Sequence, residues 1–162
     1  MDQDPKGAVA DFDEAIKLNP QSFPALQNKA HVLADLIKDD REAVQVLDTI
    51  LAKYPENPMA RAGRGVSLAR LGQREKALAD AEDALLIDTR PPNLYQVACV
   101  YALTSRQNPQ DHIRAFELLS YGLKGGFGPL GKIVEALIRA GILGKQVLSG
   151  RECSVQNGGC QI

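Results

Sequence analysis

Apolar residues recur along this chain at spacings of three and four, which place them on one face of an α-helix. The pattern predicts helices over residues 24–36, 40–53, 59–71, 75–87, 95–103 and 113–123, and one more helix within residues 1–22. Pro55, Gly72 and the pair Pro91 and Pro92 mark breaks between helices. The turns are short, so the helices are expected to form a series of hairpins.

The helices repeat with a nearly fixed period. Equivalent positions recur in six series, and in each series the second step is one residue shorter than the first: Ala8, Ala43 and Ala77; Phe12, Leu47 and Ala81; Ala15, Ile50 and Ala84; Leu26, Arg61 and Tyr95; Ala30, Gly65 and Cys99; Leu33, Leu68 and Ala102. A period of this length is typical of helical units that stack into a solenoid. Facing small residues, such as Gly65 and Ala77, are expected to let paired helices pack closely.

The segment from Arg61 to Asp88, RAGRGVSLARLGQREKALADAEDALLID, resembles a tetratricopeptide repeat, a helix-turn-helix unit of about 34 residues. Residues 11–20, DFDEAIKLNP, are similar to the end of that unit. The resemblance covers roughly residues 5–123 and implies an all-α superhelix of helix hairpins. It divides the chain into a half repeat (1–22, second helix only), repeat units (23–57 and 58–91), an extended repeat-like unit (92–127), a capping helix (128–148) and a flexible tail (149–162).

A second resemblance concerns residues 94–105, LYQVACVYALTS. They are similar to repeats appended to serine/threonine protein kinases of planctomycete-type bacteria. The chain has none of the kinase motifs, namely the Gly-rich loop, the strand lysine and the catalytic loop, so only the appended region is implied. The chain is therefore expected to be a scaffolding or regulatory part of a larger bacterial protein.

Composition and charge narrow the class of protein. Hydrophobic residues make up 44% and charged residues 24%, which is ordinary for a globular chain, and the net charge of −1 argues against nucleic-acid or membrane partners. No apolar run approaches the roughly 18 residues of a membrane span, so a cytoplasmic location is expected. Acidic residues predominate in 1–22 and basic residues in 91–162, which favours head-to-tail contact between copies.

Residues suited to catalysis or metal binding are scarce. The three cysteines, Cys99, Cys153 and Cys160, form neither a disulfide framework nor a zinc motif, and the tail pair is left as free thiols or an oxidation-dependent bond. The two histidines, His31 and His112, have no nucleophile nearby in sequence. The acidic cluster of Asp80, Glu82 and Asp83 is interpreted as a solvated helix face. No enzymatic activity, cofactor or metal is expected.

Members of this repeat family bind peptides in a concave groove lined by the first helix of each unit. The matching positions give a candidate groove of Gln27, Asn28, His31, Met59, Ala62, Gly63, Val66, Arg70, Gln96, Val97 and Val100, with Asp35, Asn93 and Leu103 as further inner positions. An alternative is that Met59, Val66 and Val100 belong to the core between repeats. Asn28 matches a position of the family's carboxylate clamp, but the clamp's Lys and Arg are absent.

Two features leave alternatives open. Arg61, Arg64 and Arg70 form either a basic strip for an acidic peptide or side chains whose stems cover apolar neighbours. The first helix has apolar residues, including Phe12 and Ile16, with no preceding helix to cover them. This face indicates either a fragment of a longer array or a surface for homo-oligomerisation, which gives self-assembly as an alternative function.

Overall fold

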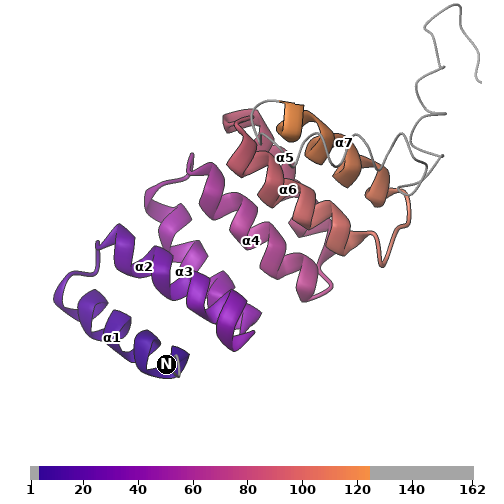
Figure 1. The fold of residues 1–162 in the computed structure, drawn as a ribbon. Coiled ribbons are helices and arrows are strands. Elements are labelled where there is room, and N and C mark those ends of the chain that lie inside the picture. Colours follow the sequence, from indigo (N-terminus) through magenta and orange to yellow (C-terminus); the bar gives the residue numbers. More distant parts are fainter. Residues whose placement is uncertain (1–3, 125–162) are drawn as a thin grey trace, which may run out of the picture.

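The computed structural model describes residues 4–124. This part of the chain contains seven α-helices, one π-helical segment and no strand, which confirms the predicted all-α fold. The helices are α1 (Pro5–Leu18), α2 (Phe23–His31), α3 (Asp40–Lys53), α4 (Pro58–Arg70), α5 (Arg74–Ile87), α6 (Pro91–Thr104) and α7 (Asp111–Lys124); the π-helical segment η1 (Val32–Ile37) continues α2. Each helix packs against the next one in the sequence, so the helices stack in chain order (Figure 1).

Local sequence explains where the helices begin. The side chains of Asp4, Asp39 and Asn57 each accept a hydrogen bond from a backbone N–H in the first turn of α1, α3 and α4. A proline stands in the first turn of α2, α4 and α6, where no backbone donor is needed. Both prolines at 91 and 92 are accommodated there, so α6 begins earlier than the predicted Tyr95.

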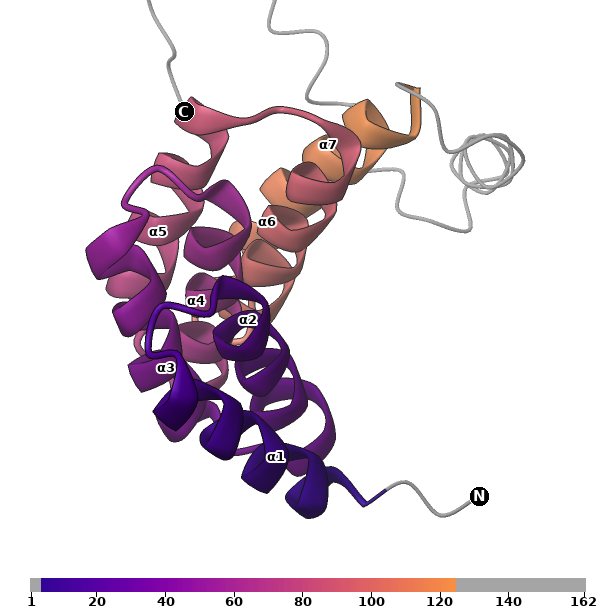
Figure 2. The same cartoon turned by 90° about the vertical axis from the view of Figure 1, so that its left-hand side faces the viewer.

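The helices form two rows. Here α2, α4 and α6 are called the inner helices, and α1, α3 and α5, which follow the other side of the stack, the outer helices (Figure 2). One buried cluster lies between α4, α5, α6 and α7, and a second lies between α2, η1 and α3. Val9 and Ile16 of α1 pack against the second cluster. The described core thus consists of two clusters that follow one another along the stack, built mainly from Ala, Leu and Val.

The unequal steps of the repeat have a structural cause. The step from the start of α2 at Phe23 to that of α4 at Pro58 is one residue longer than the step from Asp40 of α3 to Arg74 of α5. The first hairpin therefore holds one residue more between its two helix starts than the second. A π-helical turn takes up one more residue than an α-helical turn. Because η1 lies in this interval, it absorbs the extra residue, and Lys38 then ends the helix with a left-handed φ of 66°.

The register of α6 corrects the predicted repeat. The turn of residues 88–90 is one residue shorter than that of 54–57, so α6 follows α4 at a shorter interval than α4 follows α2. The residues of α6 that correspond to buried Leu26, Ala30 and Leu33 are consequently the buried Leu94, Ala98 and Tyr101, each one residue earlier than predicted. The predicted series had placed there Tyr95, Cys99 and Ala102. With the corrected register, Tyr101 falls on the tyrosine of the repeat pattern L-G-x-x-Y, and Val97 and Ala98 stand in place of its Leu and Gly.

The close helix packing expected at Gly65 is present. A Cβ atom added at Gly65 would lie 3.1 Å from the Ala77 carbonyl oxygen of α5 and 3.1 Å from Val100 Cγ2 of α6. Only a residue without a side chain lets α4 approach both neighbours this closely.

Some predictions concern other parts of the chain. The capping helix (128–148), the tail (149–162) and its Cys153 and Cys160 lie outside the described residues.

Candidate functional site

A groove with a volume of about 750 Å³ runs along the inner helices. Its walls come from α2 with η1, from α4 and from α6, and α4 lies between the other two in the row (Figure 1). Most of its lining is apolar or small, including Met59, Val66 and Leu103. Amide side chains complete it: Gln27, Asn28, Asn57 and Gln96. The groove therefore offers a wide apolar surface with a few hydrogen-bonding groups.

The structure brings eight of the eleven predicted groove residues together in the lining: Gln27, Asn28, His31, Met59, Gly63, Val66, Arg70 and Gln96. The other three, Ala62, Val97 and Val100, have no exposed surface and belong to the core cluster of α4 to α7. Their assignment to the groove was wrong. The register of α6 is the reason for Val97 and Val100, because it turns Cys99 and Leu103 toward the groove in their place. Ala62 is covered because α4 packs against α6.

Other inner positions also fall differently from the prediction. Asn93 is buried and donates to the carbonyl oxygens of Ala84 (2.9 Å) and Asp88 (2.6 Å), so it caps the end of α5 rather than lining the groove. Tyr95, which the predicted series aligned with buried Leu26, is 56% exposed and lines the groove. A count of residues in each turn, not the apolar pattern, is the signal that would have placed Tyr95 correctly.

One end of the groove carries charge. Arg70 Nη2 donates to Asp35 Oδ1 at 3.1 Å, and Arg70 Nη1 donates to the Ala34 carbonyl oxygen at 2.9 Å and to Asp40 Oδ1 at 3.4 Å. His31 Nδ1 lies 3.0 Å from Asp35 Oδ2. Burial lowers the pKa of Arg70, but the hydrogen bonds and charges of the two aspartates outweigh this and raise it. We call His31, Asp35, Asp40 and Arg70 the polar corner.

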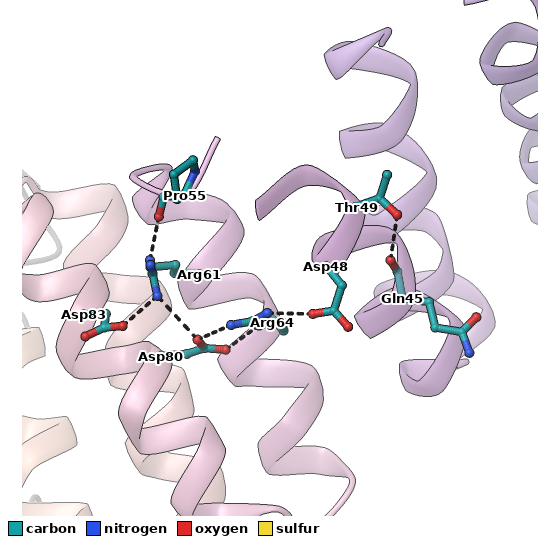
Figure 3. Close-up of polar contacts among 8 residues, drawn as sticks. All are labelled: Gln45, Asp48, Thr49, Pro55, Arg61, Arg64, Asp80 and Asp83. Carbon is teal, nitrogen blue, oxygen red and sulfur yellow. Dashed lines mark hydrogen bonds and ion pairs between the residues drawn. The ribbon is translucent and has the colours of Figure 1, made fainter. Parts of the chain in front are cut away.

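The predicted basic strip is not available to an acidic peptide. Arg64 lies between two outer helices, where it donates to Asp80 of α5 at 2.7 Å and to Asp48 of α3 at 2.6 Å (Figure 3). Arg61 donates to Asp83 at 2.6 Å and to the Pro55 carbonyl oxygen at 2.8 Å (Figure 3). Asp80 is only 4% exposed, so the expectation that it lies on a solvated face was also wrong.

The same contact repeats one unit earlier. Lys29 of α2 pairs with Asp13 of α1 and with Glu42 of α3, each at 2.8 Å. Lys29 and Arg64 occupy the position where the repeat pattern carries leucine. The chain thus replaces a core leucine twice by a cation that links two outer helices. The matched spacing of Lys29 with Asp13 and of Arg64 with Asp48 was the sequence signal for these pairs.

Cys99 and His112 are the groups outside the polar corner most suited to chemistry. Burial raises the pKa of the Cys99 thiol, and its contact with Tyr95 offsets this only in part, so the thiol form is favoured over the nucleophilic thiolate. His112 is exposed and its ring contacts the Pro109 carbonyl oxygen in the turn before α7. Within residues 4–124, no group of three His, Cys, Asp or Glu is placed to hold a metal ion. No helix in this range is long and apolar enough to cross a membrane.

The two residues predicted to form an oligomer face differ in their surroundings. Ile16 packs against the second core cluster, whereas half-buried Phe12 is not among the side chains that do so. Of the two residues, Phe12 is therefore the one whose side chain lies outside this cluster.

Comparison with known proteins identifies the class of fold. Residues 1–65 match the family model described as tetratricopeptide repeat. Such repeats are generally non-catalytic modules of protein interaction, and no catalytic family is indicated. No curated protein matches the chain.

Solved structures extend the match along the chain. The chain is similar to MamA, residues 41 to the end, from Desulfovibrio magneticus RS-1, with 26% identity and a TM-score of 0.60. The alignment covers 74% of this chain and 65% of that one. The match thus spans slightly less than two thirds of that structure. Two crystal structures of MamA share the fold at 14% identity, with TM-scores of 0.56 (91% of each chain) and 0.54 (94% of this chain and 89% of the other). The described part therefore shares the helix-hairpin solenoid fold of these structures.

Proposed function

We propose that this chain is a non-catalytic interaction module that binds an extended peptide segment of a partner protein in its groove. The observation that carries the proposal is the groove itself, whose apolar lining is combined with the amide side chains of Gln27, Asn28 and Gln96. Amides both donate and accept hydrogen bonds, so they match the free N–H and C=O groups of an extended backbone. A helical ligand has no such free groups along its length and would leave the amides without partners.

The proposal is tested by selecting octapeptides from a phage-displayed random library on the full chain. Binding of a selected peptide is then measured by fluorescence anisotropy for the wild type and two variants. Gly63→Leu places a side chain in the groove, where the nearest atom to a Cβ at position 63 is 3.8 Å away. Ala79→Leu adds the same group at an exposed position of α5. We expect Gly63→Leu to weaken binding at least about tenfold and Ala79→Leu to leave it unchanged.

Equal affinity of the selected peptide for Gly63→Leu and the wild type would place binding elsewhere.

We further propose that the module is a scaffolding or regulatory part of a larger cytoplasmic protein of a bacterium. The likeness of residues 94–105 to repeats appended to bacterial kinases supports this placement.

Self-assembly through α1 is a second candidate, favoured by the position of Phe12 outside the packed cluster. Sedimentation velocity over a dilution series tests it with Phe12→Ser. Ile16 is unsuitable for the same test because its loss would also disturb the core. A dimer that Phe12→Ser abolishes supports assembly, whereas a monomer at every concentration excludes it.

A further inference from the structure

The polar corner stands at the end of the groove where the inner helices finish. Asp35 lies in η1, and His31 is the last residue of α2. Arg70 is the last residue of α4 and reaches across to both the Ala34 carbonyl oxygen and Asp35. The π-helical segment therefore supplies two of the groups that Arg70 contacts. This corner is part of the groove, so the inference below rests on the proposed function.

The charges in the corner do not balance. Two carboxylates, Asp35 and Asp40, face one guanidinium, that of Arg70. Among the described residues that line the groove, Arg70 is the only Lys or Arg. Three of its five N–H groups donate to the two carboxylates and to a carbonyl oxygen, so its charge is already opposed by a larger negative charge in the corner. The C-terminal ends of the inner helices add partial negative charge at the same place.

The exposed His31 and Asp35 side chains of the corner offer hydrogen-bond acceptors. Nδ1 of His31 lies 3.0 Å from a carboxylate oxygen, so this nitrogen carries the proton of the neutral ring. The other ring nitrogen, Nε2, is then an acceptor, and the His31 side chain is 67% exposed. The Asp35 side chain is 43% exposed and also accepts only. Lys and Arg side chains are the protein groups that donate hydrogen bonds without accepting any.

The shape of the groove beside the corner fits the same side chains. Val66 of α4 and Leu103 of α6 line the groove together with Asp35 and Arg70. Lys and Arg bury an aliphatic stem along apolar surface and present a charged head at its end. We propose that the polar corner recognises a Lys or Arg side chain of the bound segment, with the head at Asp35 and His31 and the stem along the apolar lining.

The test follows the octapeptide selection described above. The wild-type chain should enrich peptides with Lys or Arg at one fixed position. Replacing that residue by Gln in a synthetic peptide should weaken binding to the wild type by about tenfold, the lower end of the effect of a charge-assisted hydrogen bond, because the corner is partly exposed. The same peptide change should have less than a twofold effect on Asp35→Asn. Asp35→Glu, which keeps the charge, should restore sensitivity, and Glu75→Gln, on outer helix α5, should leave it intact.

The outcomes separate the two proposals. In one outcome the selected peptides lack a fixed Lys or Arg, or carry Asp or Glu instead, while Gly63→Leu still loses binding. This result overturns the role of the polar corner and leaves the proposed binding in the groove standing. An equal effect of the peptide change on the wild type and on Asp35→Asn also overturns it. A selected peptide that binds Gly63→Leu as tightly as the wild type, or a selection that yields no binder, overturns the proposed function. Circular dichroism melts of each variant establish that the fold is retained.

Discussion

Gly65 provides a sharp test of how the inner and outer helices pack. The substitution Gly65→Ala adds one Cβ atom, which would lie 3.1 Å from the Ala77 carbonyl oxygen and 3.1 Å from Val100 Cγ2. The Val100 methyl group has some freedom to move, but the Ala77 carbonyl belongs to the backbone of α5. Helices α4 and α5 would therefore have to separate by a few tenths of an ångström, which disturbs the buried cluster around them.

Gly63→Ala is the matched control on the same helix. A Cβ at position 63 would have Leu47 Cδ2, at 3.8 Å, as its nearest neighbour, an ordinary contact. Both substitutions gain about 1 kcal/mol of helix propensity. Overpacking at position 65 costs about 1–3 kcal/mol. Gly63→Ala should thus stabilise the protein by about 1 kcal/mol, and Gly65→Ala should be less stable than Gly63→Ala by about 2 kcal/mol.

Urea denaturation followed by circular dichroism at 222 nm measures both variants and the wild type. The expected order of unfolding midpoints is Gly63→Ala, then wild type, then Gly65→Ala. A Gly65→Ala protein as stable as Gly63→Ala would refute the close approach of α4 to α5.

Three further predictions concern buried polar groups. Arg64→Leu should lower the free energy of unfolding by about 3 kcal/mol because it leaves buried Asp80 without its closest cation. The double variant with Asp80→Ala should recover most of this loss. Additive losses of the two substitutions in urea denaturation would contradict the prediction. Asn93→Ala should lower the free energy of unfolding by about 1–2 kcal/mol, since the Asp88 carbonyl oxygen loses the Asn93 donor and the Ala84 carbonyl oxygen keeps only its bond from the Asp88 N–H. An unchanged thermal midpoint would argue against the cap. Burial raises the pKa of Tyr101 from its ordinary 10.0 to about 12, so the stability it contributes is complete below pH 10 and is lost as the pH rises through about 12. Between pH 9 and pH 11.5 the urea midpoint of the wild type should fall more than that of Tyr101→Phe. Equal falls would contradict the link between Tyr101 ionisation and stability.

The fold was predictable because several local signals agree. Apolar spacing, N-capping residues and prolines all pointed to the same helices, and the range 40–53 predicted from the pattern is that of α3. The fixed period then identified how the hairpins stack. Small residues such as Gly65 marked the close packing of α4 on α5. Such agreement between local preference and global arrangement is typical of sequences that specify one fold.

The register of the inner helices was less accessible to sequence reasoning. One residue fewer in the turn before α6 changes which of its positions are buried, while the apolar pattern of α6 fits either register. Val97 and Val100 were consequently assigned to the groove, and Tyr95 and Cys99 were aligned with Leu26 and Ala30, which are buried. A single residue is about 100° of helix rotation, which is enough to exchange a core position for a groove position.

The ion pairs were missed for a different reason. Lys29 and Arg64 occupy positions that repeats of this type fill with leucine. Charged side chains are mostly exposed to solvent, so the sequence alone did not indicate that these two lie between helices. Each reaches carboxylates on two outer helices, which only the folded arrangement brings together.

The central claim, that the groove of the inner helices is the binding site, is tested most directly by mapping a selected octapeptide on the ¹⁵N-labelled chain by NMR. The account predicts that amide shift changes concentrate on α2 with η1, on the groove face of α4 and on α6, with the largest changes near Asp35 and Val66. Changes concentrated on the outer helices α1, α3 and α5, with the groove residues unaffected, would contradict it.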